Sequence, residues 1–245
     1  MATKGYNVLL FDGQLDVHFI GMLEQKIEKS RFVRVDSNVA DKLVDNNNNN
    51  EVALTEAQKQ ITEGVFKSQI PEIEKTNFIV MFEAIGETSQ PIVITQNEFM
   101  RRMKDMSTLQ PGMMNFYGEM PDSYSLIINT ENPVSKKVVE QIESLCKDEV
   151  MPIIETISKL NNEINSLKTS HQGKKDDEIP VSEKEDIKSK ENEIAELRKK
   201  ENEILVEHGS ENNLVKQLID LALLSNNMLK GEALSKFIKR SVELL

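Results

Sequence analysis

Apolar patterning over residues 1–45 predicts a short strand–helix–strand unit. Residues 7–11 form a nearly continuous apolar run closed by Asp12-Gly13, which is typical of a buried strand that ends in a turn. Apolar residues then recur with a helical period and predict a helix; they are Leu15, Phe19, Met22, Leu23 and Ile27. Residues 31–35 alternate polar and apolar positions, as a half-buried strand does. Because so small a unit cannot bury both faces of a sheet, we interpret it as the end of a larger α/β domain and the chain as a fragment of a longer protein.

An asparagine run separates this unit from the rest of the chain. Residues 46–50 are all asparagine, a composition that favours neither helix nor strand. We predict a linker over residues 46–51 and a second domain over residues 52–245. Thr55 and Gln58 have the spacing of a capping box and predict the start of a helix that runs toward Phe66.

Three short runs in the second domain predict the strands of a small sheet, at residues 78–82, 92–95 and 124–128. A capping box at residues 95–98 predicts a helix with an apolar side made of Phe99, Met100, Met103 and Met106. The irregular segment that follows carries Met113 and Met114. Unbranched thioether side chains repack easily, so this methionine-rich stretch suits varied protein partners. The alternative, that the helical stripe packs on the sheet as core, stays open.

A seven-residue pattern appears after residue 150. Apolar residues repeat at alternating spacings of three and four; they are Val150, Ile153, Ile157, Leu160, Ile164 and Leu167. A charged segment containing Gly173 and Pro180 interrupts the pattern, and a capping box at residues 182–185 opens a second patterned helix. We predict an antiparallel coiled-coil insertion at about residues 148–208. Lys190 and Glu201 fall on its seam, so we expect loose packing near the tip.

Two short helices are predicted to close the chain, with residues 226–231 as the corner. Both are apolar on more than one stripe, and a two-helix hairpin has too little interior to bury such a surface. A second copy related by a two-fold axis would cover it in a four-helix bundle. The alternative is burial against the sheet of the same subunit. The predicted dimer interface comprises Leu214, Leu218, Leu221, Leu224, Leu234, Phe237, Ile238 and Leu245.

Composition narrows the classes of function. Lys and Arg number 30 against 41 Asp and Glu, so a net charge of −11 disfavours binding to nucleic acid or an anionic membrane. No apolar run approaches the roughly 20 residues that span a bilayer, and no signal-peptide pattern is present. A single cysteine excludes an internal disulfide and suits a reducing compartment. We therefore expect a cytoplasmic protein.

No catalytic, cofactor-binding or metal-binding residues are predicted. The glycines near the N-terminus lack the spacing of a phosphate-binding loop. Cys146 falls on an apolar helical face and is interpreted as a core residue. We interpret His18 as a partly buried imidazole and the acidic residues 176–178 as a solvated loop rather than as metal ligands.

Several segments, taken in order, resemble one protein family. They are Asp-Gly-Gln-Leu-Asp at residues 12–16, Phe-Met-Arg-Arg-Met-Lys-Asp-Met at 99–106, Leu-Gln-Pro-Gly at 109–112, Gln-Leu-Ile-Asp-Leu-Ala-Leu-Leu at 217–224 and Phe-Ile-Lys-Arg at 237–240. These segments resemble the C-terminal part of the heat-shock protein 90 chaperones, in the bacterial HtpG type. The resemblance covers residues 4–145 and 210–245. It departs from the family at Val17, where an acidic residue is usual, and at the hairpin, which looks like a lineage-specific insertion.

The resemblance implies a fold and a function. The fold is α+β: a short α/β piece from the end of the middle domain, then a C-terminal domain with a three-stranded sheet, the coiled-coil insertion and a terminal helical hairpin that forms a dimeric four-helix bundle. The implied function is that of a stress-response chaperone for protein folding. Its partners would be a second copy of itself and unfolded client proteins. Client contacts would be made by Phe99, Met100, Met103, Met106, Met113 and Met114.

The resemblance also implies what this chain lacks. ATP and Mg²⁺ would bind an N-terminal domain of the parent protein, so we expect the parent to be an ATPase and this chain to hydrolyse nothing. One alternative from another class of function remains. The chain could be a coiled-coil scaffold protein that acts through residues 150–207.

Overall fold

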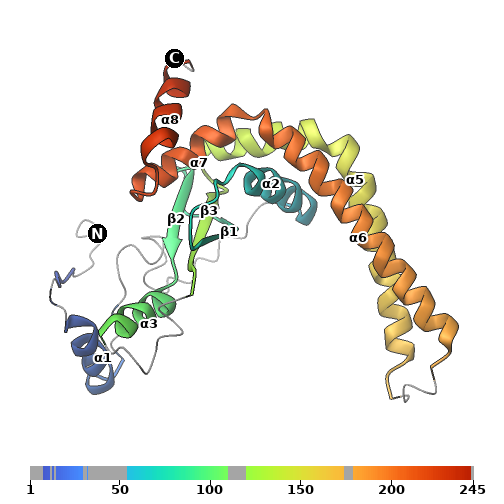
Figure 1. The fold of residues 1–245 in the computed structure, drawn as a ribbon, viewed down its shortest axis with the longest axis horizontal. Coiled ribbons are helices and arrows are strands. Elements are labelled where there is room, and N and C mark those ends of the chain that lie inside the picture. Colours follow the sequence, from blue (N-terminus) through green and yellow to red (C-terminus); the bar gives the residue numbers. More distant parts are fainter. Residues whose placement is uncertain are drawn as a thin grey trace. The chain divides into compact units, whose positions relative to one another are not determined.

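A computed structural model of the chain describes residues 8–11, 13, 15–29, 32, 54–109, 120–173 and 179–243. Within these ranges the protein is α+β, with one three-stranded mixed sheet and seven helices (Figure 1). The chain divides into two compact units, one of Met1–Val52 with Pro71–Asn132 and one of Ala53–Ile70 with Pro133–Leu245. The predicted α+β class and three-stranded sheet are confirmed. The predicted linker at residues 46–51 lies outside the described residues.

The first unit is organised around the sheet, whose strands are β1 (Thr76–Glu83), β2 (Ile92–Gln96) and β3 (Asp122–Asn129). The strand order is β1-β3-β2, with β3 parallel to β1 and antiparallel to β2. Leu126 on β3 pairs with Val80 on one side and with Ile94 on the other. Successive residues of β3 point to opposite faces, and Leu126, Ile127 and Ile128 are all buried, so the central strand is covered on both faces.

The connection between β1 and β2 is held by the side chain of Asn129 at the end of β3. Asn129 is fully buried and donates from Nδ2 to the carbonyl oxygens of Gly86 (2.9 Å) and Gln90 (3.2 Å). Its Oδ1 accepts from the backbone N–H of Glu131 at 3.1 Å. Gly86 has φ 97°, a left-handed conformation that glycine adopts without steric cost. Two neighbours of Asn129 add to this: Asn132 Nδ2 donates to the carbonyl oxygen of Ser89 at 2.8 Å, and Glu131 Oε2 accepts from Gly86 N–H at 2.6 Å. Side chains just after β3 therefore hold the backbone of this connection.

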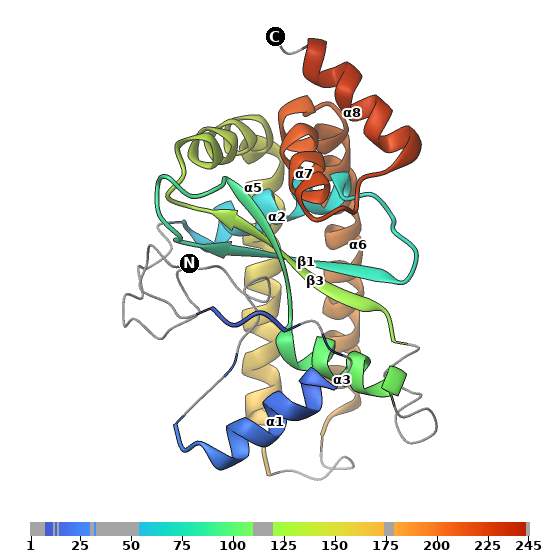
Figure 2. The same cartoon turned by 90° about the vertical axis from the view of Figure 1, so that its left-hand side faces the viewer.

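Two helices complete the described part of the first unit. Helix α1 (Asp16–Lys26) contacts α3 (Glu98–Leu109), and Figures 1 and 2 both show them side by side. Both helices were predicted. The strand predicted at residues 7–11 is wrong for residues 8–11, which lie in no strand, and Leu10 is 94% exposed. An apolar run forms a strand only where another strand pairs with it, and none of the described strands does so here. Of the second strand predicted at residues 31–35, only residue 32 is described.

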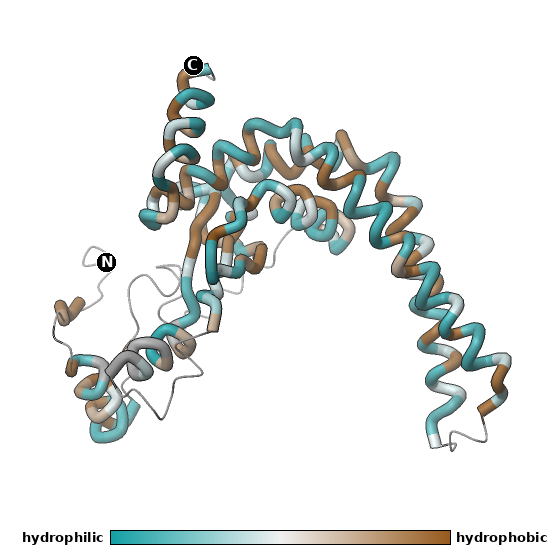
Figure 3. Tube along the Cα trace, in the orientation of Figure 1, coloured by the Kyte–Doolittle hydropathy of each residue, from teal (hydrophilic) through white to brown (hydrophobic). Residues whose placement is uncertain are grey.

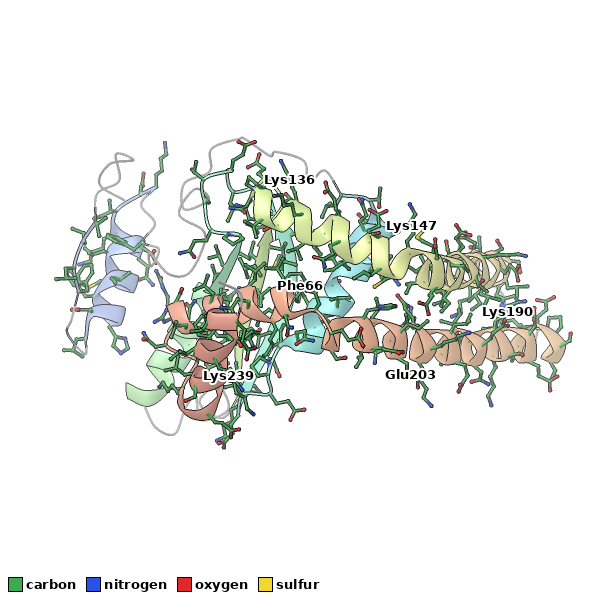
Figure 4. The ribbon with its side chains drawn as sticks, turned by 90° about the horizontal axis from the view of Figure 1, so that it is seen from above. Phe66, Lys136, Lys147, Lys190, Glu203 and Lys239 are labelled. Carbon is green, nitrogen blue, oxygen red and sulfur yellow. The ribbon has the colours of Figure 1, made fainter. Side chains whose placement is uncertain are left out.

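The second unit consists of helices α2 (Glu56–Gln69), α5 (Pro133–Ser170), α6 (Val181–Ser210), α7 (Asn213–Ser225) and α8 (Gly231–Glu243). Helix α2 packs against α5, α6 and α7, and Phe66 on its buried face is 1% exposed (Figure 4). The predicted capping box is confirmed, because Thr55 Oγ1 accepts from Gln58 N–H and Gln58 Oε1 accepts from Thr55 N–H. Helix α2 therefore occupies the centre of this unit.

Helices α2 and α6 approach closely because glycines lie at their contact. A side chain at Gly64 of α2 would clash with Leu205 of α6, and one at Gly209 of α6 would clash with Ser68 of α2. Polar contacts add to this packing. Gln60 Nε2 donates to Glu201 Oε1 at 2.6 Å, and Gln58 Nε2 donates to Glu143 Oε2 on α5 at 2.8 Å. The hydrogen bond from Gln58 is the main reason that the pKa of Glu143 is lowered.

Residues 150–207, which we call the arm, are the long continuation of α5 and α6. Side-chain contacts join residues whose numbers rise along α5 as they fall along α6. Glu149 contacts His208 at one end, and His171, just after α5, contacts Glu183 at the other, so the two helices run antiparallel. Figure 4 shows them side by side. Their shared core contains Ile153, Ile157, Leu160, Ile164 and Ile194, with Ile187, Leu197 and Ile204 packed against it. The predicted apolar seam is thus buried between the helices.

The two polar seam residues of the arm have partners. Lys190 Nζ lies 2.9 Å from Glu163 Oε2 on α5 and 3.3 Å from Asp186 Oδ1, contacts that raise the pKa of Lys190 (Figure 4). Glu201 is 6% exposed and accepts the hydrogen bond from Gln60. Loose packing near the tip stays a prediction.

Candidate functional site

The terminal hairpin exposes apolar side chains on one side of α8. Ile238 and Val242 are four residues apart, hence on one face of the helix, and are 54% and 66% exposed. Leu221 on α7 is 46% exposed. Apolar (brown) and polar (teal) positions alternate along α8 in Figure 3. These three residues, which we call the outer stripe, are apolar surface on the described part of the second unit.

The eight residues predicted for a dimer interface are placed differently by the structure. Leu221 and Ile238 are exposed, whereas Leu214, Leu224 and Leu234 are half-buried. Leu218 and Phe237 are 8% and 9% exposed within a single subunit. Leu245 lies outside the described residues. Among the described residues of the predicted interface, only Leu221 and Ile238 are therefore exposed. Val242, which is not among the eight, is also exposed on α8.

A buried charge network joins α7 to α8. Asp220 on α7 is 3% exposed, and its Oδ2 accepts from Arg240 Nη2 on α8 at 2.6 Å. Lys216 Nζ lies 3.2 Å from Asp220 Oδ1, and Arg240 Nε donates to Gln217 Oε1 at 2.9 Å. Gln217 in turn donates to Ser241 Oγ at 2.5 Å. A carboxylate buried this deeply is stable only when it is paired and hydrogen-bonded, so the network fixes which face of α8 meets α7.

On α8, the residues of the charge network and the two residues of the outer stripe occupy different faces. Phe237, Arg240 and Ser241 lie on the face toward α7, and Ile238 and Val242 lie on the other. Rotation of α8 that buried Ile238 would separate Arg240 from Asp220 and leave the buried carboxylate with Lys216 alone. The polar network therefore keeps the apolar stripe turned outward.

Helix α3 carries the part of the predicted client-contacting surface that the structure describes. Phe99 is 60% exposed, and Met100 and Met103 are half-buried. The side chain of Met106 and the whole of Met113 and Met114 lie outside the described residues. Three of the six predicted client contacts can thus be placed on α3, and Phe99 is the most accessible of them.

Groups with chemical reactivity are sparse in the structure. Among the described residues, no three His, Cys, Asp or Glu side chains are grouped so that they could hold a metal ion. Cys146 on α5 is buried, as predicted, and its burial, with a smaller contribution from the charge of Glu149, raises the pKa of the thiol to about 11. A thiol with so high a pKa is a weak nucleophile near neutral pH. None of the described helices has the length and apolar character needed to cross a membrane.

Comparison with known proteins identifies relatives over the whole chain. The chain is 49% identical over 245 residues to the chaperone protein HtpG of Bacteroides thetaiotaomicron, which is all of this chain and 36% of that protein. It is 46% identical to HtpG of Bacteroides fragilis over 243 residues and 44% identical to HtpG of Porphyromonas gingivalis over 244 residues, again 36% of each protein. The chain belongs to the HtpG chaperone family. The predicted resemblance to heat-shock protein 90 chaperones is therefore confirmed.

The extent of the match to HtpG proteins bears on the arm. Because the alignment with the Bacteroides thetaiotaomicron HtpG covers all of this chain, that protein carries a counterpart of residues 150–207. The chain spans about a third of the length of the HtpG proteins it matches. No family model matches the chain, and no solved structure matches it significantly.

Proposed function

We propose that this chain serves an HtpG-type molecular chaperone as its dimerisation element and as part of its client-contacting surface. The observation that carries the proposal is the outer stripe of Leu221, Ile238 and Val242, held outward by the buried Asp220–Arg240 pair. An exposed apolar stripe on a rigidly oriented helix is suited to pairing with another protein surface. The names of the relatives support the chaperone role.

The partner that we favour for the outer stripe is the α7–α8 hairpin of a second copy of this chain. A self-complementary interface needs the same patch on both subunits, and a two-fold axis beside α8 would place one stripe against the other. Two hairpins joined in this way would form the four-helix bundle expected from the sequence. Dimerisation would hold two client-contacting surfaces near each other and raise their effective concentration.

The client-contacting surface is assigned to Phe99, Met100, Met103, Met106, Met113 and Met114. Its support in the structure is the 60% exposure of Phe99 at the start of α3. A large aromatic side chain in water next to flexible methionine side chains suits transient contact with unfolded chains. The exposure of Phe99 also argues against the alternative in which the whole stripe is core.

Suppression of the aggregation of a denatured test protein, followed by light scattering, tests the client surface. We expect Phe99→Glu combined with Met103→Glu to weaken suppression while the mass in solution is unchanged. Val181→Glu combined with Val206→Glu is a matched control, because these two residues of α6 are 68% and 43% exposed and the pair receives the same two charges. Unchanged suppression in the Phe99→Glu, Met103→Glu variant would remove the client surface from the proposal.

A scaffold that acts through the arm is the second candidate function. The observation in its favour is a groove of about 830 Å³ along the arm, whose lining includes Ile154, Leu167 and Lys190. Replacement of residues 158–197 by a short glycine–serine turn, which keeps Glu201 and Leu205 in their contacts with α2, separates the two candidates. A chaperone dimerisation element stays dimeric and keeps its effect on aggregation, whereas a scaffold protein loses its binding activity.

The remaining assignments come from the family. We propose that residues 1–45 are the end of the middle domain, that residues 46–51 are a linker, and that residues 52–245 are the C-terminal dimerisation domain. ATP and Mg²⁺ are assigned to a part of the parent protein other than this chain. A cytoplasmic location completes the proposal.

A further inference from the structure

Arg102 on α3 forms hydrogen bonds with Glu24 on α1 and with the backbone of Phe32. Its Nη1 donates to Glu24 Oε2 at 2.8 Å, and its Nη2 donates to Glu24 Oε1 at 3.4 Å and to the carbonyl oxygen of Phe32 at 2.5 Å. The backbone N–H of Phe32 donates to Glu24 Oε1 at 2.7 Å. One guanidinium therefore joins α3 both to α1 and to the chain that follows it.

Several apolar side chains of α1 stay exposed beside this contact, although Leu23 is half-buried. Leu15, Phe19 and Met22 of the helical stripe are 71%, 44% and 43% exposed. The Arg102 and Glu24 side chains, in contrast, are only 24% and 23% exposed. A two-pronged guanidinium–carboxylate contact is among the stronger polar interactions, and because both side chains are still about a quarter exposed, dissolved salt can screen it in part. The Arg102–Glu24 pair therefore contributes to the attachment of α1 to α3, and its loss should loosen α1.

We propose that Arg102 and Glu24 form an electrostatic latch that holds α1 and the backbone of Phe32 against α3. Loss of charge at either end, or high ionic strength, releases α1 while the sheet stays folded. Under the proposed domain division, this latch spans the junction between the middle and C-terminal domains. The latch depends neither on dimerisation nor on client binding, so it goes beyond the proposed function.

Amide hydrogen exchange of the 245-residue chain, read by mass spectrometry on peptides from α1 and β1, tests the latch. We expect Arg102→Gln and Glu24→Gln each to accelerate exchange in α1 by roughly tenfold, the loss typical of a hydrogen bond to a charged group, without a change in β1. Lys26→Gln is the matched control, since it changes a charge at the end of α1, and it should leave α1 exchange as in the wild type. High salt should accelerate exchange of the wild-type α1 peptides.

The charge-swapped double variant Glu24→Arg, Arg102→Glu distinguishes an effect on this ion pair from a general loss of stability caused by the substitutions. A latch predicts slower α1 exchange in the double variant than in a single variant with Arg102→Glu alone, because opposite charges again face each other. Arg102→Lys keeps the charge but loses the fork and should be intermediate. Unchanged α1 exchange in both Gln variants overturns the latch. It is equally overturned if the swap gives no recovery, or if β1 exchange rises as much as α1 exchange.

Discussion

Arg240 on α8 and Asp220 on α7 are 20 residues apart in sequence and share a 2.6 Å hydrogen bond in which the Asp220 side chain is only 4% exposed. The pair sets the orientation of the last helix, because the carboxylate has little solvent to replace the guanidinium. Its position on one face of α8 directs Ile238 and Val242 to the other. An ionic contact therefore determines which apolar residues are available to a partner.

Removal of Arg240 should destabilise the hairpin strongly. Arg240→Met keeps the length of the side chain but leaves the Asp220 carboxylate with Lys216, and we expect a loss of about 3 kcal/mol in the free energy of unfolding. Urea unfolding followed by circular dichroism measures it. Lys236→Met is the control, because the Lys236–Glu232 pair on the same helix is largely exposed and should contribute little. Equal stability of the two variants would show that the buried pair is dispensable.

The contact between α2 and α6 should not tolerate a larger residue at Gly64. Gly64→Ala brings its Cβ against Leu205, a side chain that is 4% exposed, and we expect a loss of about 1 to 3 kcal/mol from overpacking. In a chain that already carries Leu205→Ala, the added Gly64→Ala should cost less free energy of unfolding than it does in the wild type. The new methyl group then fills the space that the leucine side chain vacated.

Gly21→Ala provides the comparison for this glycine. Nothing lies within 4 Å of a Cβ at Gly21 on α1, so the substitution should be neutral or slightly stabilising through helix propensity. Thermal unfolding measures both variants: Gly64→Ala should lower the melting temperature, and Gly21→Ala should leave it unchanged or raise it slightly. A stable Gly64→Ala variant, with no coupling to Leu205, contradicts the close contact between these helices.

Stability should fall at high pH through Cys146. Burial raises the pKa of this thiol to about 11, whereas an unfolded thiol titrates near 8.5. The unfolded chain therefore loses the thiol proton first as the pH rises, and the stability contributed by the protonated thiol declines between these two values. Unfolding in urea at about pH 8 and about pH 10.5 should show a larger loss for the wild type than for Cys146→Ala. Equal losses would contradict the raised pKa.

Local patterns predicted the helices well because helices depend on neighbouring residues. The capping box of Thr55 and Gln58 and the apolar seam from Ile153 to Ile164 are both short-range signals, and both are present in the structure. Residues 8–11 show the limit of such reasoning. An apolar run does not reveal whether another strand lies beside it, and Leu10 is instead exposed.

The contacts that define the candidate sites were harder to predict. Asp220 joins Arg240 across a helical corner, and Arg102 reaches Glu24 from 78 residues away, distances over which sequence periodicity carries no information. One signal was available for the first pair. Asp220 interrupts an otherwise apolar run between Ile219 and Leu221, and a carboxylate in such a place needs a buried partner.

The mass of the chain in solution tests the central claim most directly. Sedimentation equilibrium at micromolar concentration should give twice the 27.9 kDa mass of one chain for the wild type, and a single-chain mass for Ile238→Glu combined with Val242→Glu. Lys236→Glu, which makes the same change in net charge at an exposed position on the opposite side of α8 from Ile238, should remain dimeric. A wild-type chain that sediments as a monomer, or a double variant that stays dimeric, contradicts the assignment of the outer stripe as the dimer interface.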